Sequence, residues 1–371
     1  MSLAPLTPPE TSRYARHIML PEIGMAGQEK LKAAKVLVIG AGGLGCPVLQ
    51  YLTAVGIGTI GLVDSDYVEE SNLQRQILFS PRDTGRLKAE VAREKLEEQN
   101  PLIKLVSYPV RLNAANALSI LADYDLVLDG SDNFKTRYLV NDACVLLNKP
   151  LVFGSIYKFE GQVSVFNYQG GPTYRCLYPE ESELASCAEV GVLGVLPGIV
   201  GCLMANEAIK VITGIGEVTA GELLILNALN LSFQTFTFAL DPQNKAITNL
   251  IPEVDSCSLP MSELSFADVI QRLKAGEKFS FVDVRQPEEF QSLNIGGQLF
   301  PLPSLSKTWE HIPNQNPVLV YCKSGVRSRQ AAEFLHTKGF DQVFSLNNGI
   351  RNLRPDHLNL LRQWITKTAP V

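Results

Sequence analysis

The sequence predicts an α/β protein with two domains, a larger one built on a mixed sheet and a smaller one. Two apolar runs, within residues 36–39 and 316–321, are rich in valine, leucine and isoleucine, as are strands buried on both faces of a parallel sheet. Each run leads into a short loop and then a helical pattern. The 371 residues also exceed what one ordinary core accommodates, which favours two domains.

The composition excludes several classes of protein. Hydrophobic residues make up 46% and charged residues 19% of the chain, as in a soluble globular protein. The net charge of −5 provides no basic surface for nucleic acid. Residues 1–10 lack a targeting pattern, and the apolar stretch 190–205 contains Pro197 and several glycines, so we expect a buried helix there and no membrane partner.

The cysteines argue for a reducing compartment. They are odd in number, scattered and without a CxxC pair, which speaks against a disulfide framework and for free thiols in the cytoplasm. The seven are Cys46, Cys144, Cys176, Cys187, Cys202, Cys257 and Cys322.

A glycine-rich turn follows the first strand. Gly40, Gly42 and Gly45 have GxGxxG spacing, with Gly43 between them, and a helical pattern follows up to Gly56. Between a strand and a helix such a turn lets the backbone approach a phosphate, which the free N–H groups and the helix dipole attract. The turn therefore predicts a nucleotide site, and a tight turn without a ligand is the alternative.

Asp64 follows the second strand, residues 59–63. It lies about twenty residues beyond Gly45, where an acid accepts hydrogen bonds from a ribose in dinucleotide-binding folds. Up to this point the chain also fits a nicotinamide-dependent dehydrogenase.

The next segments supply more positive charge than a pyrophosphate needs. A polar loop spans residues 66–76, and a helix is predicted over 86–99. The cations suit a triphosphate whose charge shifts during reaction, and a solvated surface with a few salt bridges is the alternative. These polar residues are Arg16, Asn72, Arg75, Gln76 and Lys88.

Asp132 and Asn133 follow a further buried strand, residues 125–129. Because strands of such a sheet end at the ligand crevice, both are expected on its rim. Asp132 is the predicted Mg²⁺ ligand, with water and phosphate oxygens completing the coordination. Asp129 is expected at the same edge, where it could instead cap the next helix.

Five segments together resemble the MoeB/ThiF/HesA family of adenylating enzymes over residues 10–240. They read RYARHIMLPEIG, GAGGLGCPV, VDSDYVEESNLQRQ, GRLK and LDGSDN, in this order. The resemblance implies a Rossmann-like domain that uses ATP and Mg²⁺ to activate the C-terminal glycine of a ubiquitin-like sulfur carrier of the MoaD/ThiS kind, ending in Gly-Gly. It also implies a homodimer.

The resemblance assigns a role to each predicted site residue. Asp64 would hold the ribose and Asp132 the magnesium. Arg16 would reach the γ-phosphate in the other subunit. The residues implied to hold phosphates are Asn72, Arg75 and Lys88.

Two cysteine sites are judged against the same family. Many members bind structural zinc through two CxxC pairs, but here Thr173 and Cys176 stand at the first and only Cys257 lies near the second, so no zinc is expected. Cys187 matches the family's conditional catalytic cysteine, which would attack the activated carrier or resolve a persulfide adduct. A buried, inert thiol is the alternative for Cys187.

The second domain has its own reactive loop. Turn and irregular segments predict domains over 1–245 and 262–371, joined by a linker at 246–261. Cys322 opens a tight loop between a strand and a helix. The loop N–H groups, the helix N-terminus, Lys323 and Arg327 all favour an anion on this sulfur, which makes it nucleophilic and stabilises a persulfide.

The sequences DVRQPEEF at 283–290 and CKSGVRS at 322–328 resemble a rhodanese-type sulfurtransferase domain. Asn294 and Asn348 depart from that pattern but lie outside the active loop. The fusion of the two domains resembles sulfur-carrier activators of the MoeZ type.

The combined expectation is a two-step enzyme. The first domain adenylates the carrier's C-terminal carboxylate. Cys322, loaded by a persulfide or thiosulfate donor, then attacks the acyl-adenylate and displaces AMP. Finally, Cys187 cleaves the acyl disulfide to release a thiocarboxylate. Three alternatives are activation and conjugation of a ubiquitin-like modifier without sulfur transfer, a dehydrogenase, and a non-enzymatic scaffold. The carrier and its pathway, molybdopterin or another, leave no mark in the sequence.

Overall fold

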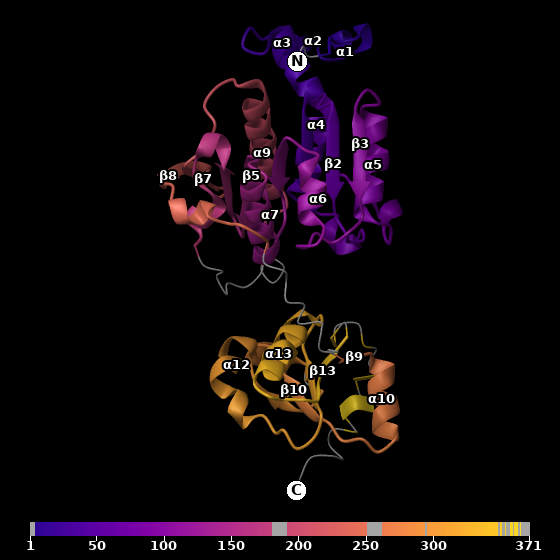
Figure 1. Cartoon of the computed structure of the whole chain (residues 1–371). Helices are drawn as coiled ribbons and strands as arrows, with labels where there is room; N and C mark the ends of the chain where they lie inside the picture. Colours follow the sequence, from indigo (N-terminus) through magenta and orange to yellow (C-terminus); the bar gives the residue numbers. More distant parts are fainter. Residues whose placement is uncertain are drawn as a thin grey trace. The chain divides into compact units, whose positions relative to one another are not determined.

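A computed structural model describes residues 4–179, 191–250, 262–293 and 295–347, and further on residues 349–350, 353, 357–358, 360–362 and 364. The chain divides into two compact units, Met1–Pro252 and Glu253–Val371, shown in Figure 1. Each unit has its own sheet and its own core, and each is described by itself.

The larger unit is built on an eight-stranded mixed sheet with the order β3-β2-β1-β4-β5-β6-β7-β8. The strands from β3 to β5 pair in parallel, and β6, β7 and β8 continue the sheet as antiparallel neighbours. The carboxyl ends of the parallel strands therefore share one edge, where ligand crevices form in such sheets. The strands are β1 (Lys35–Ile39), β2 (Thr59–Val63), β3 (Lys104–Tyr108), β4 (Leu126–Asp129), β5 (Leu151–Tyr157), β6 (Glu160–Phe166), β7 (Glu222–Asn227) and β8 (Ser232–Thr237).

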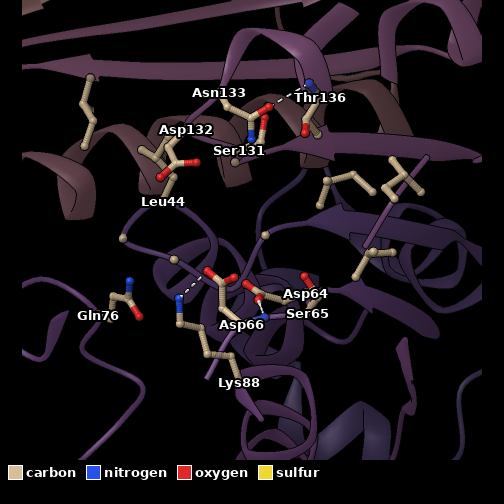
Figure 2. A pocket seen from close by; sticks show the side chains of 18 of the residues that line it. Leu44, Asp64, Ser65, Asp66, Gln76, Lys88, Ser131, Asp132, Asn133 and Thr136 are labelled. Atoms are coloured by element: carbon tan, nitrogen blue, oxygen red, sulfur yellow. Dashed lines mark hydrogen bonds and ion pairs between the residues drawn. The ribbon is translucent and has the colours of Figure 1, made fainter. Parts of the chain in front are cut away.

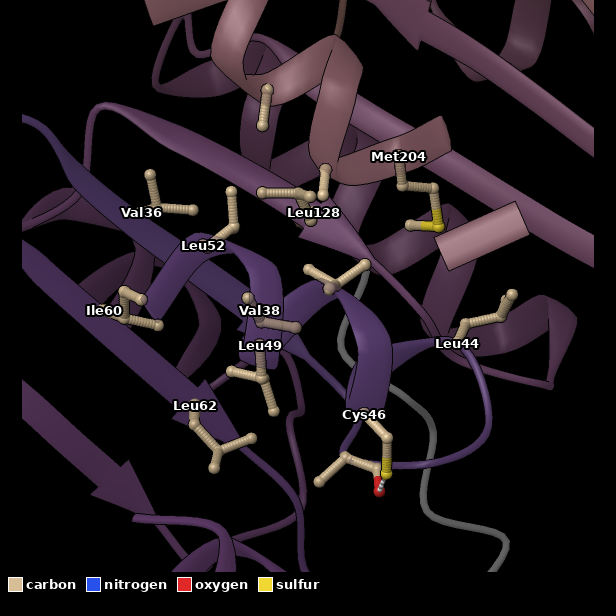
Figure 3. Packing of buried hydrophobic residues seen from close by; sticks show 14 of the residues in the cluster. Val36, Val38, Leu44, Cys46, Leu49, Leu52, Ile60, Leu62, Leu128 and Met204 are labelled. Carbon is tan, nitrogen blue, oxygen red and sulfur yellow. Dashed lines mark hydrogen bonds between the residues drawn. The ribbon is translucent and has the colours of Figure 1, made fainter. Parts of the chain in front are cut away.

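Helices cover both faces of this sheet because the side chains of a strand alternate between them. On β1, Val36 and Val38 join one hydrophobic cluster while Leu37 and Ile39 join the other. Figure 3 shows the first cluster, in which strand residues pack against two helices, α4 (Gly45–Val55) and α9 (Leu196–Thr213).

The remaining helices of this unit complete the two layers. Leu31 and Leu96 bring α3 and α5 to the first cluster, whereas Leu121 and Tyr138 bring α6 and α7 to the second. Figure 1 shows α1, α2 and α3 together at one end of the unit. The helices are α1 (Pro8–Arg13), α2 (Ala15–Ile18), α3 (Gly24–Ala33), α5 (Lys88–Gln99), α6 (Ala117–Ala122), α7 (Phe134–Leu146) and α8 (Tyr174–Leu177), with short 3-10 turns at Glu70–Asn72, Pro81–Asp83, Tyr168–Gly170 and Pro242–Lys245.

Helix α9 is the apolar segment expected from residues 190–205. Within the described residues it alone is long and apolar enough to cross a membrane, and half of it is buried inside the protein. Leu196, Val200 and Met204 belong to the first hydrophobic cluster, in contact with the sheet and α4. The helix is therefore a core element of this unit.

The smaller unit has a five-stranded parallel sheet with the order β11-β10-β12-β13-β9. One face packs against α10 and the other against α12 and α13. The elements are β9 (Ser262–Leu264), α10 (Phe266–Lys274), β10 (Ser280–Asp283), α11 (Pro287–Ser292), β11 (Gln298–Leu299), α12 (Leu302–Thr308), β12 (Val318–Tyr321), α13 (Val326–Thr337) and β13 (Val343–Leu346), with a 3-10 turn at Trp309–His311.

The predicted fold class is confirmed, and element ends differ from the expectations only locally. The helix expected over 86–99 begins at Lys88, because Leu87 is still extended. Gly56 ends α4 in the left-handed conformation, at φ +83°, as its glycine suggested. Strand β5 ends at Tyr157, where the chain turns into the antiparallel hairpin with β6.

Candidate functional site

A polar cavity of about 680 Å³ opens at the carboxyl ends of β1, β2 and β4. Its size falls in the range of small-molecule sites. Figure 2 shows its polar side chains in two groups, one around Ser131 and Asp132 and one around Asp64, Asp66 and Lys88. The predicted residues that line it are Gly40, Gly42, Gly43, Asp64, Arg75, Gln76, Lys88, Asp132 and Asn133.

The three motif glycines serve different purposes in the turn. Gly40 has a φ of +89°, which other residues rarely adopt, and it starts the turn after β1. A side chain on Gly42 would meet nothing nearer than Gln76 Nε2, at 3.8 Å, so its Cα faces the open cavity. Gly45 does not line the cavity, and a Cβ there would lie 1.9 Å from the carbonyl oxygen of Gly40. Gly45 thus lets α4 start close against the turn.

Asp64 is held at the end of β2 by backbone donors. Its Oδ2 accepts from the N–H of Ala41 at 2.7 Å and its Oδ1 from the N–H of Asp66 at 2.8 Å. Burial raises the pKa of this carboxyl, and the positive charge of Lys88 opposes the rise. The first bond ties the carboxylate to the glycine turn, so the acid lies beside the predicted nucleotide.

Lys88 brings a buried cation to the cavity. Its side chain is 6% exposed, and its Nζ lies 3.0 Å from Oδ2 of Asp66, a bond drawn in Figure 2. The N–H of Lys88 also donates to the carbonyl oxygen of Asp66 at 2.9 Å, which fixes the start of α5 to the loop after β2. The ammonium is thereby aimed into the cavity.

Arg75 and Gln76 come from the loop after the 3-10 turn Glu70–Asn72. Asn72 does not line the cavity; its Oδ1 accepts from Arg75 Nη2 at 2.9 Å. Arg16 is also absent from the lining and lies exposed on α2. Asn72 therefore orients the guanidinium of Arg75, and Arg16 would need another copy of the chain to serve a nucleotide.

The loop after β4 forms the other side of the cavity. Asp132 is exposed on this loop, and the Oδ1 of Asn133 accepts from the N–H of Thr136 at 2.9 Å. Asn133 thus caps α7, a role that the sequence assigned as a possibility to Asp129. Asp129 is instead buried at the end of β4.

Two buried residues that the sequence did not suggest hold this loop through Ser131. Arg137 is 5% and Asp129 1% exposed; burial raises the pKa of the Asp129 carboxyl, and the positive charge of Arg137 opposes that rise. The N–H of Ser131 donates to Oδ1 of Asp129 at 2.9 Å, and Nη2 of Arg137 donates to the carbonyl oxygen of Ser131 at 3.2 Å. Asp129 and Arg137 therefore hold the peptide next to Asp132, and Arg137 itself lines the cavity.

The cavity fits a nucleotide triphosphate with magnesium. The open face of Gly42 admits a phosphate, Arg75 and Lys88 provide cations, and Asp132 presents a carboxylate to solvent as Mg²⁺ requires. Among the described residues no three His, Cys, Asp or Glu side chains gather as metal ligands. A magnesium ion here would depend on one carboxylate together with water and phosphate.

Cys176 stands where many members of the family have a zinc ligand, and no zinc is expected in this chain. Its sulfur accepts hydrogen bonds from the N–H groups of Thr173 and Asp241, both at 3.4 Å. Burial raises the pKa of this thiol, but the hydrogen bonds outweigh it and the pKa is lowered. Cys187 and Cys257 lie outside the described residues, and the absence of zinc stays a prediction.

Cys322 follows β12 and begins the loop that leads into α13. The side chain is fully buried, and its sulfur accepts from the N–H of Gly325 at 3.1 Å. The N–H of Ile350 donates to the carbonyl oxygen of Cys322 at 3.0 Å, and a Cβ on Gly349 would lie 2.4 Å from that oxygen. These contacts fix the start of the loop.

The guanidinium of Arg327 is bound to a carboxylate. Nη1 and Nη2 donate to the two carboxylate oxygens of Glu289, on α11, at 2.6 and 3.0 Å. This bidentate pair lowers the pKa of Glu289 to about 2. Sequence reasoning placed Arg327 and Lys323 as cations beside the sulfur; Lys323 is exposed, and the pairing with Glu289 was not foreseen.

Two family models match the chain. The ThiF family matches residues 14–247, the unit that holds the cavity. The rhodanese-like domain matches residues 265–354, the unit that holds Cys322.

Curated relatives match one or both units. A probable adenylyltransferase/sulfurtransferase MoeZ of Mycobacterium tuberculosis is 44% identical, covering 96% of this chain and 98% of the relative. A sulfur carrier protein adenylyltransferase of Thermus thermophilus is 55% identical over 64% of this chain and 90% of its own. The adenylyltransferase and sulfurtransferase MOCS3-1 of Zea mays is 36% identical, with shares of 93% and 82%.

Solved structures resemble the chain over part of its length. Escherichia coli MccB with succinimide has a TM-score of 0.55 and 25% identity, and the match covers 62% of this chain and 72% of that one. The same enzyme with ATP has a TM-score of 0.53 and 25% identity, with shares of 58% and 68%.

Proposed function

Because this chain belongs to the ThiF family and also carries a rhodanese-like domain, we propose that it activates a ubiquitin-like sulfur carrier and converts its C-terminal carboxylate into a thiocarboxylate. The chain is an enzyme with the two classes of activity that its relatives' names state, adenylyl transfer and sulfur transfer. One observation carries the proposal for the first step: a single cavity unites the glycine turn, Asp64, Lys88 and Asp132.

In the first step the carrier's carboxylate oxygen attacks the α-phosphorus of ATP, and the bond to the β-phosphate breaks. Both reactants are anions, so cations must offset their repulsion and stabilise the leaving pyrophosphate. Lys88 and Arg75 provide this charge, Asp64 holds the ribose, and the glycine turn donates N–H groups. Asp132 would hold Mg²⁺, which neutralises phosphate charge.

In the second step the sulfur comes from the rhodanese-like domain. The terminal sulfur of a Cys322 persulfide attacks the carbonyl carbon of the acyl-adenylate, and AMP leaves with the electrons of the C–O bond. Cys187 then attacks the Cys322 sulfur of the acyl disulfide, which releases the thiocarboxylate and leaves a protein disulfide for an external thiol to reduce.

Several finer features belong to the same proposal. The enzyme acts as a cytoplasmic homodimer, in which Arg16 of each subunit serves the other's triphosphate. It takes sulfur from a persulfide or thiosulfate donor and binds a carrier of the MoaD/ThiS kind. The name of the Thermus thermophilus relative, a sulfur carrier protein adenylyltransferase, supports this kind of partner.

The test is intact-mass spectrometry of a carrier that ends in Gly-Gly, incubated with the protein, Mg-ATP and thiosulfate. A gain of about 16 Da, one oxygen replaced by sulfur, is expected with the native enzyme and not with Cys322→Ala. Thiocarboxylate formed equally well by Cys322→Ala would overturn the second step. AMP formation with conjugation and no mass gain would favour modifier activation without sulfur transfer.

A further inference from the structure

We propose that Tyr14 is a positioning residue for the adenylation step. It anchors the helix that carries Arg16, and so it sets where this arginine meets the nucleotide of a second copy of the chain. This role rests on the proposed function, in which Arg16 of each subunit serves the other's triphosphate. Tyr14 does not line the cavity of its own chain, and it acts on the reaction through Arg16.

Tyr14 lies at the junction of α1 and α2, which together form an N-terminal arm, residues 8–18. It ends α1 and precedes α2, and its carbonyl oxygen accepts from the N–H groups of His17 and Ile18 at 2.9 and 3.0 Å. The backbone of Tyr14 therefore starts α2, a helix of four residues in which Arg16 is exposed. Because so short a helix has little stability of its own, its position depends on what holds its first end.

The side chain of Tyr14 is buried, with 5% exposure, and is held at its hydroxyl group and at its ring. The hydroxyl oxygen accepts from Nδ2 of Asn100 at 2.9 Å, and the same nitrogen donates to the carbonyl oxygen of Thr53 at 2.7 Å. The ring lies against Gly56, where a Cβ would be 2.3 Å from Cζ of Tyr14. The absence of a side chain at Gly56 thus makes room for the ring.

The anchor belongs to two helices whose other ends form the cavity. Asn100 ends α5, the helix that begins with Lys88, and Gly56 ends α4, which begins at the glycine turn. A further bond to the end of α5 comes from Arg13, whose Nη2 donates to the carbonyl oxygen of Gln99. The N-terminal arm is therefore fixed to the same two helices that start at the nucleotide site.

The N-terminal arm and the cavity of one chain lie at opposite ends of these helices. Helix α4 runs from Gly45 to Val55 and therefore extends about 16 Å, at about 1.5 Å per residue. Arg16 accordingly does not line the cavity of its own chain. Its exposed side chain is available to a nucleotide in another chain, and the anchor at Tyr14 determines the direction in which it is presented.

The test uses mixed dimers in which a single nucleotide site can work. One protomer carries Lys88→Gln, which disables its own site but leaves its Arg16 in place. The other protomer carries Arg16→Ala and keeps Lys88. The two are co-expressed with different affinity tags and purified as the mixed dimer, whose ATP–pyrophosphate exchange with the Gly-Gly carrier then depends on Arg16 of the Lys88→Gln protomer.

Tyr14→Leu is introduced into one protomer at a time. In the Lys88→Gln protomer, which donates Arg16, it should lower the exchange rate about tenfold, since a group misplaced by about 1 Å can cost up to about 100-fold in rate. In the Arg16→Ala protomer, which holds the working site, it should leave the rate within about twofold. A merely structural role of Tyr14 would lower the rate in either arrangement. Tyr14→Phe keeps the ring against Gly56 and should show the same asymmetry with a smaller loss.

The contrary outcomes separate this role from its premises. An equal loss in the two arrangements, or no loss in either, overturns the role of Tyr14 alone. A mixed dimer that does not form, or that shows no exchange although circular dichroism shows folded protomers, overturns the service of Arg16 across subunits together with it. Native protein without exchange overturns the proposed adenylation as well.

Discussion

The ammonium of Lys88 lies 3.0 Å from a carboxylate oxygen of Asp66, although the lysine side chain is 6% and the aspartate side chain 70% exposed. The two residues of this ion pair therefore differ in how easily each side chain can move away from its partner. Asp66 can turn into solvent at little cost, whereas Lys88 is fixed by its surroundings. The pair thus keeps the buried ammonium of Lys88 in the cavity. A phosphate oxygen can replace the carboxylate of Asp66 as its partner.

The first prediction concerns this cation. Lys88→Gln should lower ATP–pyrophosphate exchange with a competent carrier by at least about 100-fold, because a preorganised charge near the leaving group is lost. Asp66→Asn keeps the ammonium and should stay within about tenfold of the native rate. Exchange by Lys88→Gln within about tenfold of native would remove this residue from the proposed site, provided that circular dichroism shows a folded chain.

The second prediction concerns Asp129 and Arg137, the two buried residues that bind Ser131. Arg137→Met removes the hydrogen bond to the carbonyl oxygen of Ser131 and the positive charge that opposes the burial penalty of the Asp129 carboxylate, which should destabilise the larger unit by about 2 kcal/mol. The double variant Arg137→Met/Asp129→Asn should regain part of this loss, since no carboxylate is then left buried beside the missing charge. Urea unfolding followed by fluorescence measures both, and equal stability of the two variants would show that the two residues are not coupled.

The sequence could predict Lys88 at the cavity but not the buried residues that bind Ser131. Lys88, Asp64 and Asp132 could be placed in one site because each follows a recognisable strand or opens a helix, and parallel strands end at one edge. Their roles toward ATP remain proposals. The glycine turn could likewise be predicted from the spacing of its glycines and from its position between a strand and a helix.

Arg137 and Glu289 could not be found in this way. A single arginine in a helix, or a glutamate in a PEEF segment, reads as a solvated side chain, and only the packed structure shows that one is buried and the other bound to an arginine. The one available signal was the apolar surroundings of Arg137, since residues 138–140 and 143–145 of the sequence are mostly apolar. Asn133 shows a further limit, because it lines the cavity as predicted but its Oδ1 also caps α7, which the sequence did not indicate.

The third prediction follows from the pKa of Glu289, which its bonds with Arg327 lower from 4.5 to about 2. A carboxyl with a depressed pKa in the folded state stabilises that state above the unfolded pKa, and the contribution disappears as the pH falls through the folded value. The smaller unit should therefore lose about 2 kcal/mol of stability between about pH 4.5 and pH 2 from this group, after allowance for solvent screening. Glu289→Gln should lack this part of the acid dependence. An identical pH profile of unfolding in the two proteins would contradict the assignment.

The fourth prediction compares two glycines of the turn by adding one methyl group to each. Gly45→Ala places a Cβ 1.9 Å from the carbonyl oxygen of Gly40, where neither backbone segment can move without separating α4 from β1, so we expect a loss of roughly 3 kcal/mol or a chain that does not fold. Gly42→Ala meets only the flexible end of Gln76 at 3.8 Å, so its stability should change by less than about 1 kcal/mol. Because the new methyl group projects into the cavity, however, Gly42→Ala should weaken ATP binding about tenfold or more by titration calorimetry. Unchanged ATP affinity in a folded Gly42→Ala protein would mean that the phosphates do not lie against this turn.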